Sequence, residues 1–329
     1  MKSLSSIFSF DTIGFRVSKL FSLNIIYVIV GFLLIEVFIR YIIPDGQYPT
    51  GHWRNNELRI QTSQLEELGD VDIMFTGSSL CASNIPPDEF DNEMKKNGID
   101  IISFNTGVRG CDYEGIAEGF KKLFWERKRS KYVVLVISPV DLNDANLGVR
   151  NRTSSFIKTF QTPFYKAIMV DFFSQISWVF GFRNEIKEYI KTRKWIYEEP
   201  IVGIRGYVPM DLKPNIKVTD LNLKIDKDAV TSQSLFNFVT WLVNQDVKVI
   251  IIEALMFSLE RERLDPHELK KFYEILEELD KIESINYLNT NDIIPDDKYF
   301  IDSGHLSLEG GEVYAKNLAN KFLEAGFPW

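Results

Sequence analysis

Cysteine and histidine are scarce in this chain of 329 residues, which contains two cysteines and three histidines. A structural zinc site needs about four clustered ligands and a disulfide framework needs several cysteine pairs, so the sequence excludes both. We therefore expect no metal and no cofactor. Each histidine can be weighed singly, and we interpret His52 and His267 as surface residues, which leaves His305 as the candidate for chemistry.

Basic residues are outnumbered, with 38 lysines and arginines against 46 aspartates and glutamates and a formal charge of −8. The chain has no run of basic residues and no basic patch with interleaved aromatic residues, so nucleic acid is not expected as a partner. Repeats and low-complexity tracts are also missing. The length and the 45% share of hydrophobic residues instead indicate a globular domain with a large core and an additional segment.

One long hydrophobic stretch does occur, at residues 20–43, after a polar tail at residues 1–19. Glu36 and Arg40 interrupt it, but their four-residue spacing allows them to pair on a helix near a membrane interface. The stretch is long enough to span a bilayer and lacks the small residues of a cleavage site, so we interpret it as an uncleaved transmembrane anchor. The alternative is a buried amphipathic helix. The flanking basic residues favour an N-terminus inside only slightly.

A linker is expected at residues 44–69, with a helix-like segment in its second half, before a domain at residues 70–329. That domain alternates short runs that are apolar on both faces with segments of helical pattern. This alternation is typical of a parallel sheet covered by helices on both sides. The expected strands lie at residues 72–76, 100–104, 132–138, 247–253 and 285–288, and the expected helices at 86–98, 113–127, 232–244, 266–281 and 308–323. We therefore predict an α/β fold, a three-layer α/β/α sandwich with a five-stranded parallel, flavodoxin-like sheet.

A long insertion at about residues 147–227 separates the third and fourth expected strands. Its aromatic centre carries Lys166 and Asp171, which makes it a poor second membrane span. An insertion at the carboxyl end of a strand lies beside the active site of an open α/β sheet. It is therefore a lid, a substrate cradle, an interfacial element on the bilayer, or simply a helical pair that widens the core. Its aromatic residues are candidates to stack on sugar rings or, as is more common, to form the local core of the insertion; they are Trp178, Trp195, Tyr197 and Tyr207.

The first strand ends abruptly at Gly77, Ser78 and Ser79, followed by helix signals. Ser79 is therefore expected at a helix N-terminus, where unpaired N–H groups and the helix dipole stabilise developing negative charge. This environment suits a nucleophile whose reaction generates an oxyanion. The same residues are also typical of a plain turn with an N-cap serine.

Near the other end of the chain, Asp302 precedes His305 by three residues in a turn that contains glycine. The carboxylate can reach the imidazole Nδ1, which fixes the tautomer and leaves Nε2 free as a base. Because the first and fifth strands can end at the same sheet edge, we predict that Ser79 completes a catalytic triad. A surface turn or a fragment of a metal site is the alternative. Asp296 and Asp297 are weaker candidates to orient the histidine.

Two further loops follow the second and third strands, where oxyanion donors would be needed. Gly107 lies in a turn that allows a backbone N–H to point toward the Ser79 loop. Asn143 offers a side-chain amide, whereas Asp141 beside it would repel an oxyanion. Each loop alone is ordinary, but four such features at the ends of successive strands are hard to attribute to turns.

This ordered set resembles the SGNH, or GDSL-like, hydrolase superfamily over residues 70–325. The matching blocks are residues 77–80, Gly107, Asn143, and Asp302 with His305. The chain departs from the family pattern at Ser78, where Asp is usual. It departs again around Asn143, where Pro-Val-Asp-Leu-Asn-Asp replaces Gly-x-Asn-Asp.

The resemblance implies an ester hydrolase or acyltransferase, with the Ser79 backbone, Gly107 and Asn143 holding the oxyanion. A Gly-Ser-Ser block behind a membrane helix looks like the anchored members, such as the D-alanine-transfer protein of teichoic acid synthesis and the polysaccharide O-acetylation proteins. Those members imply an acyl ester of a surface glycan as substrate, an integral membrane acyl donor protein as partner, and a domain outside the cytoplasm. The alternative is a catalytically silent binding or scaffolding protein. Outside the cytoplasm, Cys81 and Cys111 could pair, or remain buried thiols.

Overall fold

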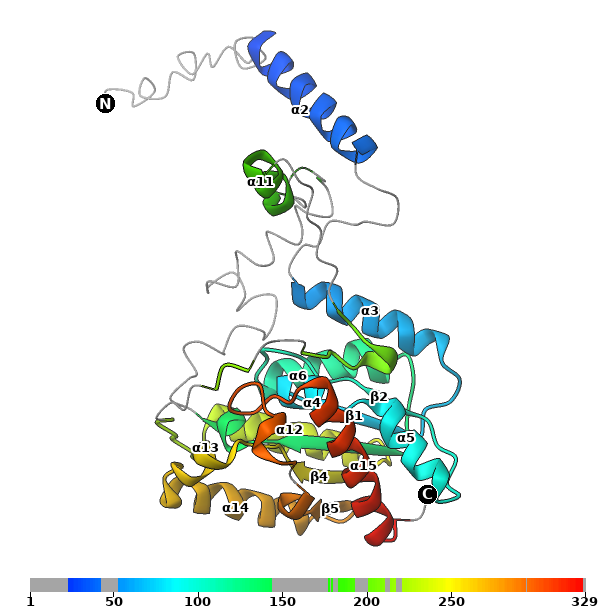
Figure 1. Cartoon of the computed structure of the whole chain (residues 1–329), viewed down its shortest axis with the longest axis vertical. Coiled ribbons are helices and arrows are strands. Elements are labelled where there is room, and N and C mark those ends of the chain that lie inside the picture. Colours follow the sequence, from blue (N-terminus) through cyan, green and yellow to red (C-terminus); the bar gives the residue numbers. More distant parts are fainter. Residues whose placement is uncertain are drawn as a thin grey trace, which may run out of the picture. The chain divides into compact units, whose positions relative to one another are not determined.

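The computed structural model describes two compact parts of the chain, and each is considered by itself. The first unit comprises Met1–Gly51 and Val170–Tyr197, and the second His52–Met169 and Glu198–Trp329. The residues described are 23–42, 53–143, 177, 179, 183–192, 201–210, 214–216, 221–293 and 295–327. Figure 1 labels most of their helices and strands.

The first unit contains helix α2 (Leu23–Ile42). The pairing expected from the four-residue spacing is confirmed, because Arg40 lies 3.5 Å from the Glu36 carboxylate. Glu36 also accepts hydrogen bonds from Ser177 Oγ at 2.9 Å and from the Val179 N–H at 3.3 Å. Part of the insertion therefore contacts α2.

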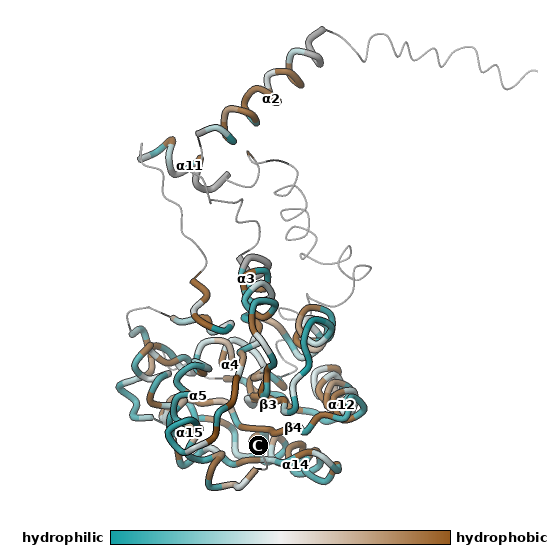
Figure 2. The backbone as a smooth tube through the Cα atoms, turned by 90° about the vertical axis from the view of Figure 1, so that its right-hand side faces the viewer, coloured by the Kyte–Doolittle hydropathy of each residue, from teal (hydrophilic) through white to brown (hydrophobic). Residues whose placement is uncertain are grey.

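Helix α2 carries large apolar side chains that remain exposed, among them Val28 at 71% exposure. Figure 2 shows this helix as a mostly hydrophobic stretch. Across the described ranges, however, no helix is long and apolar enough to cross a membrane. The transmembrane anchor predicted at residues 20–43 is therefore not found there, and the ends of that prediction, like the tail at 1–19, lie outside the described residues.

The second unit is built on one parallel sheet. Its strands are β1 (Ile73–Gly77), β2 (Ser103–Asn105), β3 (Tyr132–Ile137), β4 (Lys248–Glu253) and β5 (Ile285–Leu288). They lie in the order β2-β1-β3-β4-β5, and every neighbouring pair is parallel. The predicted five-stranded, flavodoxin-like sheet is confirmed.

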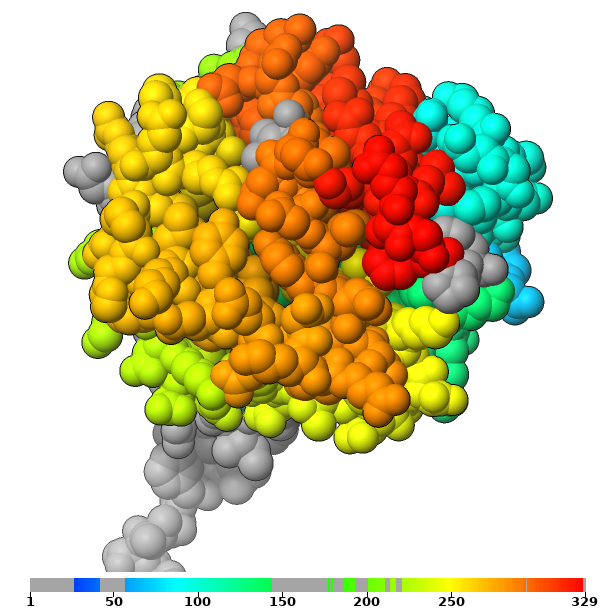
Figure 3. Space-filling view, turned by 90° about the horizontal axis from the view of Figure 1, so that it is seen from below, coloured from blue at the N-terminus to red at the C-terminus, as the bar shows by residue number. Residues whose placement is uncertain are grey.

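Helices cover both faces of this sheet because its strands are apolar on both sides. Val134 and Val136 belong to one core cluster, and Val133 and Leu135 to the other. The first face is covered by α5 (Pro87–Lys96) and α15 (Leu308–Glu324), and the second by α6 (Tyr113–Gly119), η2 (Phe120–Trp125), α12 (Val230–Val243) and α14 (Pro266–Asp280). Figure 3 shows the gold surface of α14 and the red surface of α15 on either side of the residues that connect them.

Two helical segments differ from the expectation. The helix predicted at residues 113–127 is α6 continued by the π-helical turn η2, which inserts one extra residue per turn. The helix-like half of the predicted linker is α3 (Trp53–Glu67), and its Leu65 is fully buried in the core of the second unit. This helix is therefore part of the packed domain.

Where the chain returns from the insertion, the turn η5 (Ile204–Gly206) packs against α3. Gln64 Oε1 accepts the Gly206 N–H at 2.8 Å, and Gln61 Nε2 donates to the Gly206 carbonyl at 2.8 Å. Tyr207 follows as a buried residue, which agrees with the alternative that it belongs to the local core. Trp178, Trp195 and Tyr197 lie outside the described residues.

Gly206 has no room for a side chain, and we expect Gly206→Ala to lower the free energy of unfolding by at least about 3 kcal/mol. The φ angle is +81°, and an added Cβ would collide with the Asn105 carbonyl oxygen. Chemical denaturation measures the change. Gly98→Ala is the control, because its φ is +85° but nothing lies within 4 Å, so only about 1 kcal/mol of backbone strain is expected. Equal losses in both variants would contradict the steric argument.

Candidate active site

A cavity of about 190 Å³ lies at the carboxyl edge of the sheet, beyond the ends of β1, β3 and β4. It is lined by Ser78, Ser79, Leu80, Ser138, Val140, Asp141, Leu221, Leu255, Met256, Glu260, Asp302, Ser303, Gly304 and His305. The structure therefore brings Ser79, Asp302 and His305 together, although more than 220 residues separate the first from the other two.

Ser79 is the first residue of helix α4 (Ser79–Asn84), which follows β1 directly. Gly77 makes this abrupt junction possible, because a Cβ there would lie 2.7 Å from the Val136 carbonyl oxygen of β3. Ser79 is half-buried beside the cavity. Ser78 is buried and donates its hydroxyl hydrogen to Asp141 Oδ2 at 3.2 Å, so this proton is held by Asp141 and not directed toward His305. Of the two serines, Ser79 is the better placed to react.

The turn at residues 302–305 is organised by the carboxylate of Asp302. Its Oδ1 accepts the backbone N–H groups of Gly304 at 2.9 Å and His305 at 2.8 Å. The same carboxylate reaches the imidazole, with 2.9 Å between Asp302 Oδ2 and His305 Nδ1. The geometry predicted from the three-residue spacing is thus present.

The electrostatics of this pair suit a proton acceptor. Burial raises the pKa of Asp302, but hydrogen bonds from the His305 ring and from two backbone amides outweigh burial and lower that pKa to about 2. His305 Nε2 is buried and has no hydrogen-bond partner within the described part of the chain. A buried ring nitrogen without a partner is unfavourable unless a ligand or reacting group supplies a proton.

The other candidates for the orienting carboxylate and for the base do not contribute to this site in the described part of the chain. Asp297 accepts the Ser258 N–H at 3.3 Å, and Asp296 pairs with Lys298 at 3.5 Å. His267 is exposed near the start of α14. His52 lies outside the described residues.

Asp141 ties the ends of two strands together. Its carboxylate accepts Ser138 Oγ at 2.7 Å and the Ser138 N–H at 3.1 Å. Its own N–H donates to Ser138 Oγ at 3.1 Å, so the two backbone-to-side-chain bonds form a capping box on the turn η3 (Pro139–Leu142). With Ser78 bound to the same carboxylate, the carboxyl ends of β1 and β3 are joined.

Neither cysteine is equipped to act as the nucleophile. Burial, and secondarily the Asp141 charge, raises the pKa of the Cys81 thiol, so a thiolate is disfavoured. Cys81 and Cys111 are both buried and form no disulfide, which is the second of the two alternatives left open by the sequence.

The predicted oxyanion donors Gly107 and Asn143 are not brought to the cavity. The Gly107 N–H donates to Asn105 Oδ1 at 2.9 Å. The Asn143 amide holds the segment at 222–224, accepting the Lys224 N–H at 2.9 Å and donating to the Asn222 carbonyl at 3.2 Å. Neither residue lines the cavity, because each is used to fix a neighbouring loop.

The third predicted donor, the Ser79 backbone, belongs to the first N–H groups of α4. The initial amides of a helix have no intrahelical acceptor. In α4 these belong to Ser79 and Leu80, since the Cys81 and Ala82 N–H groups already bond to the Ser78 carbonyl. Both residues line the cavity.

Sequence reasoning missed the apolar wall and two polar residues of the site. Leu255 and Met256 follow β4 directly, and Glu260 comes from the short helix α13 (Ser258–Glu262). The position of Leu255 and Met256 directly after a parallel strand could have indicated that they line the site. Glu260 and Asn84, discussed below, have no local motif that could have found them.

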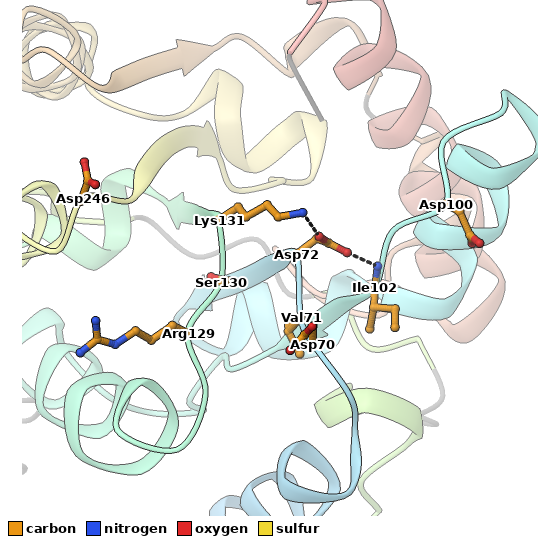
Figure 4. Close-up of a pocket in the computed structure, with 9 residues that line it drawn as sticks. All are labelled: Asp70, Val71, Asp72, Asp100, Ile102, Arg129, Ser130, Lys131 and Asp246. Carbon is orange, nitrogen blue, oxygen red and sulfur yellow. Dashed lines mark hydrogen bonds and ion pairs between the residues drawn. The ribbon is translucent and has the colours of Figure 1, made fainter.

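A second hollow, of about 800 Å³, lies at the opposite edge of the sheet, near the amino ends of the strands. In Figure 4, Asp72 lies at its centre and accepts Lys131 Nζ at 2.7 Å and the Ile102 N–H at 3.1 Å. These bonds join strand ends and leave no base and nucleophile side by side. No cluster of three metal-ligating side chains occurs among the residues that the structure describes.

Comparison with known proteins gives only a distant likeness. No protein-family model and no curated protein sequence matches the chain. A structure from Streptococcus pneumonia, provisionally named a platelet activating factor, is 11% identical, with a TM-score of 0.40 over 82% of this chain and 94% of that one. A second, from Desulfitobacterium hafniense DCB-2 and provisionally named a lipolytic protein of the G-D-S-L family, is 11% identical, with a TM-score of 0.39 over 77% and 99%. Likeness at this level assigns no activity to the chain.

Proposed function

We propose that this protein is a serine esterase or O-acyltransferase of the SGNH type, in which Ser79 forms an acyl-enzyme. One observation carries the proposal: His305 is oriented by Asp302, its Nε2 is buried without a partner in the described residues, and it lines the same cavity as Ser79. Ser79 is not hydrogen-bonded to His305 here. Catalytic hydrogen bonds are often long before substrate binds and shorten in the complex.

The reaction follows from these positions. Ser79 Oγ attacks the acyl carbon while its proton passes to His305 Nε2, and the negative oxygen is held by the first N–H groups of α4. His305 then gives the proton to the departing alkoxide, which leaves an ester on Ser79. Water or an acceptor hydroxyl, deprotonated by His305, attacks that ester and restores the enzyme. Asp302 stabilises the imidazolium in both steps.

The cavity favours a short acyl group. Its volume is about 190 Å³, and the apolar part of its wall is formed by Leu80, Val140, Leu221, Leu255 and Met256. Such a wall can bury a few methylene groups, each worth about 0.8 kcal/mol. This size supports acetyl and similarly short esters as substrates.

We therefore expect kcat/KM on a series of p-nitrophenyl esters to peak between acetyl and butyryl and to fall at least about 100-fold by decanoyl, because the longer chain must displace the cavity wall. Steady-state release of p-nitrophenol measures the series, and Ser79→Ala gives the background rate. Equal efficiency with the decanoyl ester would contradict the assignment of this cavity to the acyl group.

The natural substrate is proposed as an acyl ester of a cell-surface glycan, with hydrolysis ranked ahead of transfer. The support for this class is the sequence resemblance alone. The larger part of the insertion that would hold an acceptor lies outside the described residues. The test is to supply an acetyl ester with and without glycan acceptors and to follow the acyl group. Ester turnover without any acceptor dependence would exclude transfer.

Attachment to a membrane, an integral membrane acyl donor as partner and a position outside the cytoplasm are likewise proposals, and they rest on the sequence of residues 20–43 and on the resemblance. A C-terminal reporter that is active only in the cytoplasm distinguishes the two locations. A folded domain that shows no reaction at Ser79 would instead support the silent binding protein.

A further inference from the structure

We infer that Asn84 is a positioning residue that sets His305 relative to Ser79, an inference that rests on the proposed function. Asn84 is the last residue of α4, five positions after Ser79, and is 1% exposed. Its Nδ2 donates to the Gly304 carbonyl at 2.7 Å, and its Oδ1 accepts the Leu306 N–H at 2.9 Å. The side chain therefore binds the backbone on both sides of His305.

A second contact shows how closely the histidine turn lies against α4. A Cβ added at Gly304 would come within 2.7 Å of Leu80 Cδ2. Leu80 lies in the first turn of α4, and Asn84 is the last residue of that helix. The two contacts place the turn along the whole length of the helix that begins with Ser79.

The helix itself is held from its other side. Asn105, fully buried at the end of β2, donates from Nδ2 to the carbonyls of Cys81 and Ile85, both at 2.9 Å. The Ala82 carbonyl accepts the Val208 N–H at 2.8 Å. Because these bonds hold α4 in place, the hydrogen bonds of Asn84 fix the position of the histidine turn relative to Ser79.

Asp302 cannot fix the position of His305 relative to Ser79. It lies in the same turn as His305, so their hydrogen bond moves with the turn and fixes only the tautomer and ring orientation. The Phe257 N–H also holds the turn, through the Ser303 carbonyl at 2.9 Å, but it comes from the segment after β4. Among the hydrogen bonds of the described residues, those of Asn84 join the base directly to the helix of the nucleophile.

A buried amide with two hydrogen bonds can also be merely structural, and Gln61 provides the matched control. Gln61 is 1% exposed, and its Nε2 donates to the carbonyls of Gly206 at 2.8 Å and Gly107 at 3.3 Å. It touches neither α4 nor the histidine turn by hydrogen bonds. Loss of either amide leaves backbone groups unsatisfied, so both variants are expected to lose stability.

The experiment compares Asn84→Ala, Asn84→Asp and Gln61→Ala in the full chain, below the unfolding temperature of each. A fluorophosphonate probe forms a bond between Ser79 Oγ and phosphorus, expels fluoride and transfers the serine proton to His305. For Asn84→Ala we expect the second-order labelling rate and kcat on an acetyl ester to fall at least about 30-fold, with KM within about twofold. For Gln61→Ala both rates stay within about threefold of the wild type.

Asn84→Asp covers the case in which the alanine variant does not fold. A buried carboxyl group has a raised pKa, and its protonated form can both donate and accept as the amide does. The labelling rate relative to wild type is therefore expected to recover as the pH is lowered from about 8 to about 6. A ratio that does not change with pH argues against positioning through these two hydrogen bonds.

A readout independent of activity separates this inference from the proposed function. The chain has three histidines, so isotope labelling of histidine gives few ring signals to assign. The His305 signals should shift or broaden in Asn84→Ala and stay unchanged in Gln61→Ala. Unchanged His305 signals and labelling rate in a folded Asn84→Ala variant would overturn the inference. A wild type that is not labelled at Ser79 would overturn the proposed function, while the His305 signals would still decide the role of Asn84.

Discussion

Replacing Ser79 with alanine is expected to lower kcat on acetyl esters by about 10⁴-fold or more, because a serine triad acts as a unit and its nucleophile has no substitute. The neighbouring hydroxyl cannot take over, since Ser78 is buried and bound to Asp141. Cys81, two residues after Ser79, has its thiol pKa raised by burial. Ester turnover, together with mass mapping of the phosphonylated peptide, measures the effect.

Ser78→Ala is the matched control for that variant. It removes a hydroxyl of the same kind from the adjacent position, but leaves Ser79 at the start of α4. We expect a loss of about tenfold or less, through the weakened connection to Asp141. If Ser78→Ala were the inactive variant and Ser79→Ala the active one, the nucleophile would have been assigned to the wrong serine.

Replacing Asp302 with asparagine is expected to lower kcat by about 10³- to 10⁴-fold, an effect of the size known for the equivalent change in a serine protease triad. An amide can donate to His305 Nδ1, which favours the tautomer whose proton is on Nε2 and so removes the base. Asp297→Asn is the control, because that carboxylate holds the Ser258 N–H outside the cavity. Similar losses in both variants would show that the effect is general destabilisation.

The lowered pKa of Asp302 determines how its contribution to the stability of the fold changes with pH. The pKa of Asp302 is lowered from 3.8 to about 2 in the folded protein, so the folded state binds this proton less well than the unfolded chain. Its stabilising contribution is complete above about pH 4 and is lost as the pH falls toward 2. Asp302 is therefore ionised above about pH 4. A loss of activity at higher pH values must come from the titration of another group.

The sequence predicted the sheet well because strands apolar on both faces, separated by amphipathic helices, have one favourable arrangement. Asp302 and His305 were also predictable, since three residues of one turn decide their contact. Gly107 and Asn143 do not line the cavity, and their role as oxyanion donors stays a prediction. Their surroundings could not be predicted from the sequence, because their hydrogen bonds depend on partners far along the chain. Gln61 bonds to Gly107 across 46 residues, and no local pattern contains that information.

Asn84 was invisible in the sequence for the same reason. A buried amide in the last turn of a short helix looks like an ordinary C-terminal residue until its partners are known. Those partners, the backbone groups beside His305, lie 220 and 222 residues away.

These distances along the chain also have a consequence for when the protein can first act. Contacts of such large sequence separation form late in folding, because a long loop must close before they contribute. During synthesis, α4 is complete long before the histidine turn has been translated. Under the proposed function, a chain in which the turn at 302–305 has not yet been synthesised therefore has Ser79 without His305. Activity would then begin only when this turn packs against α4.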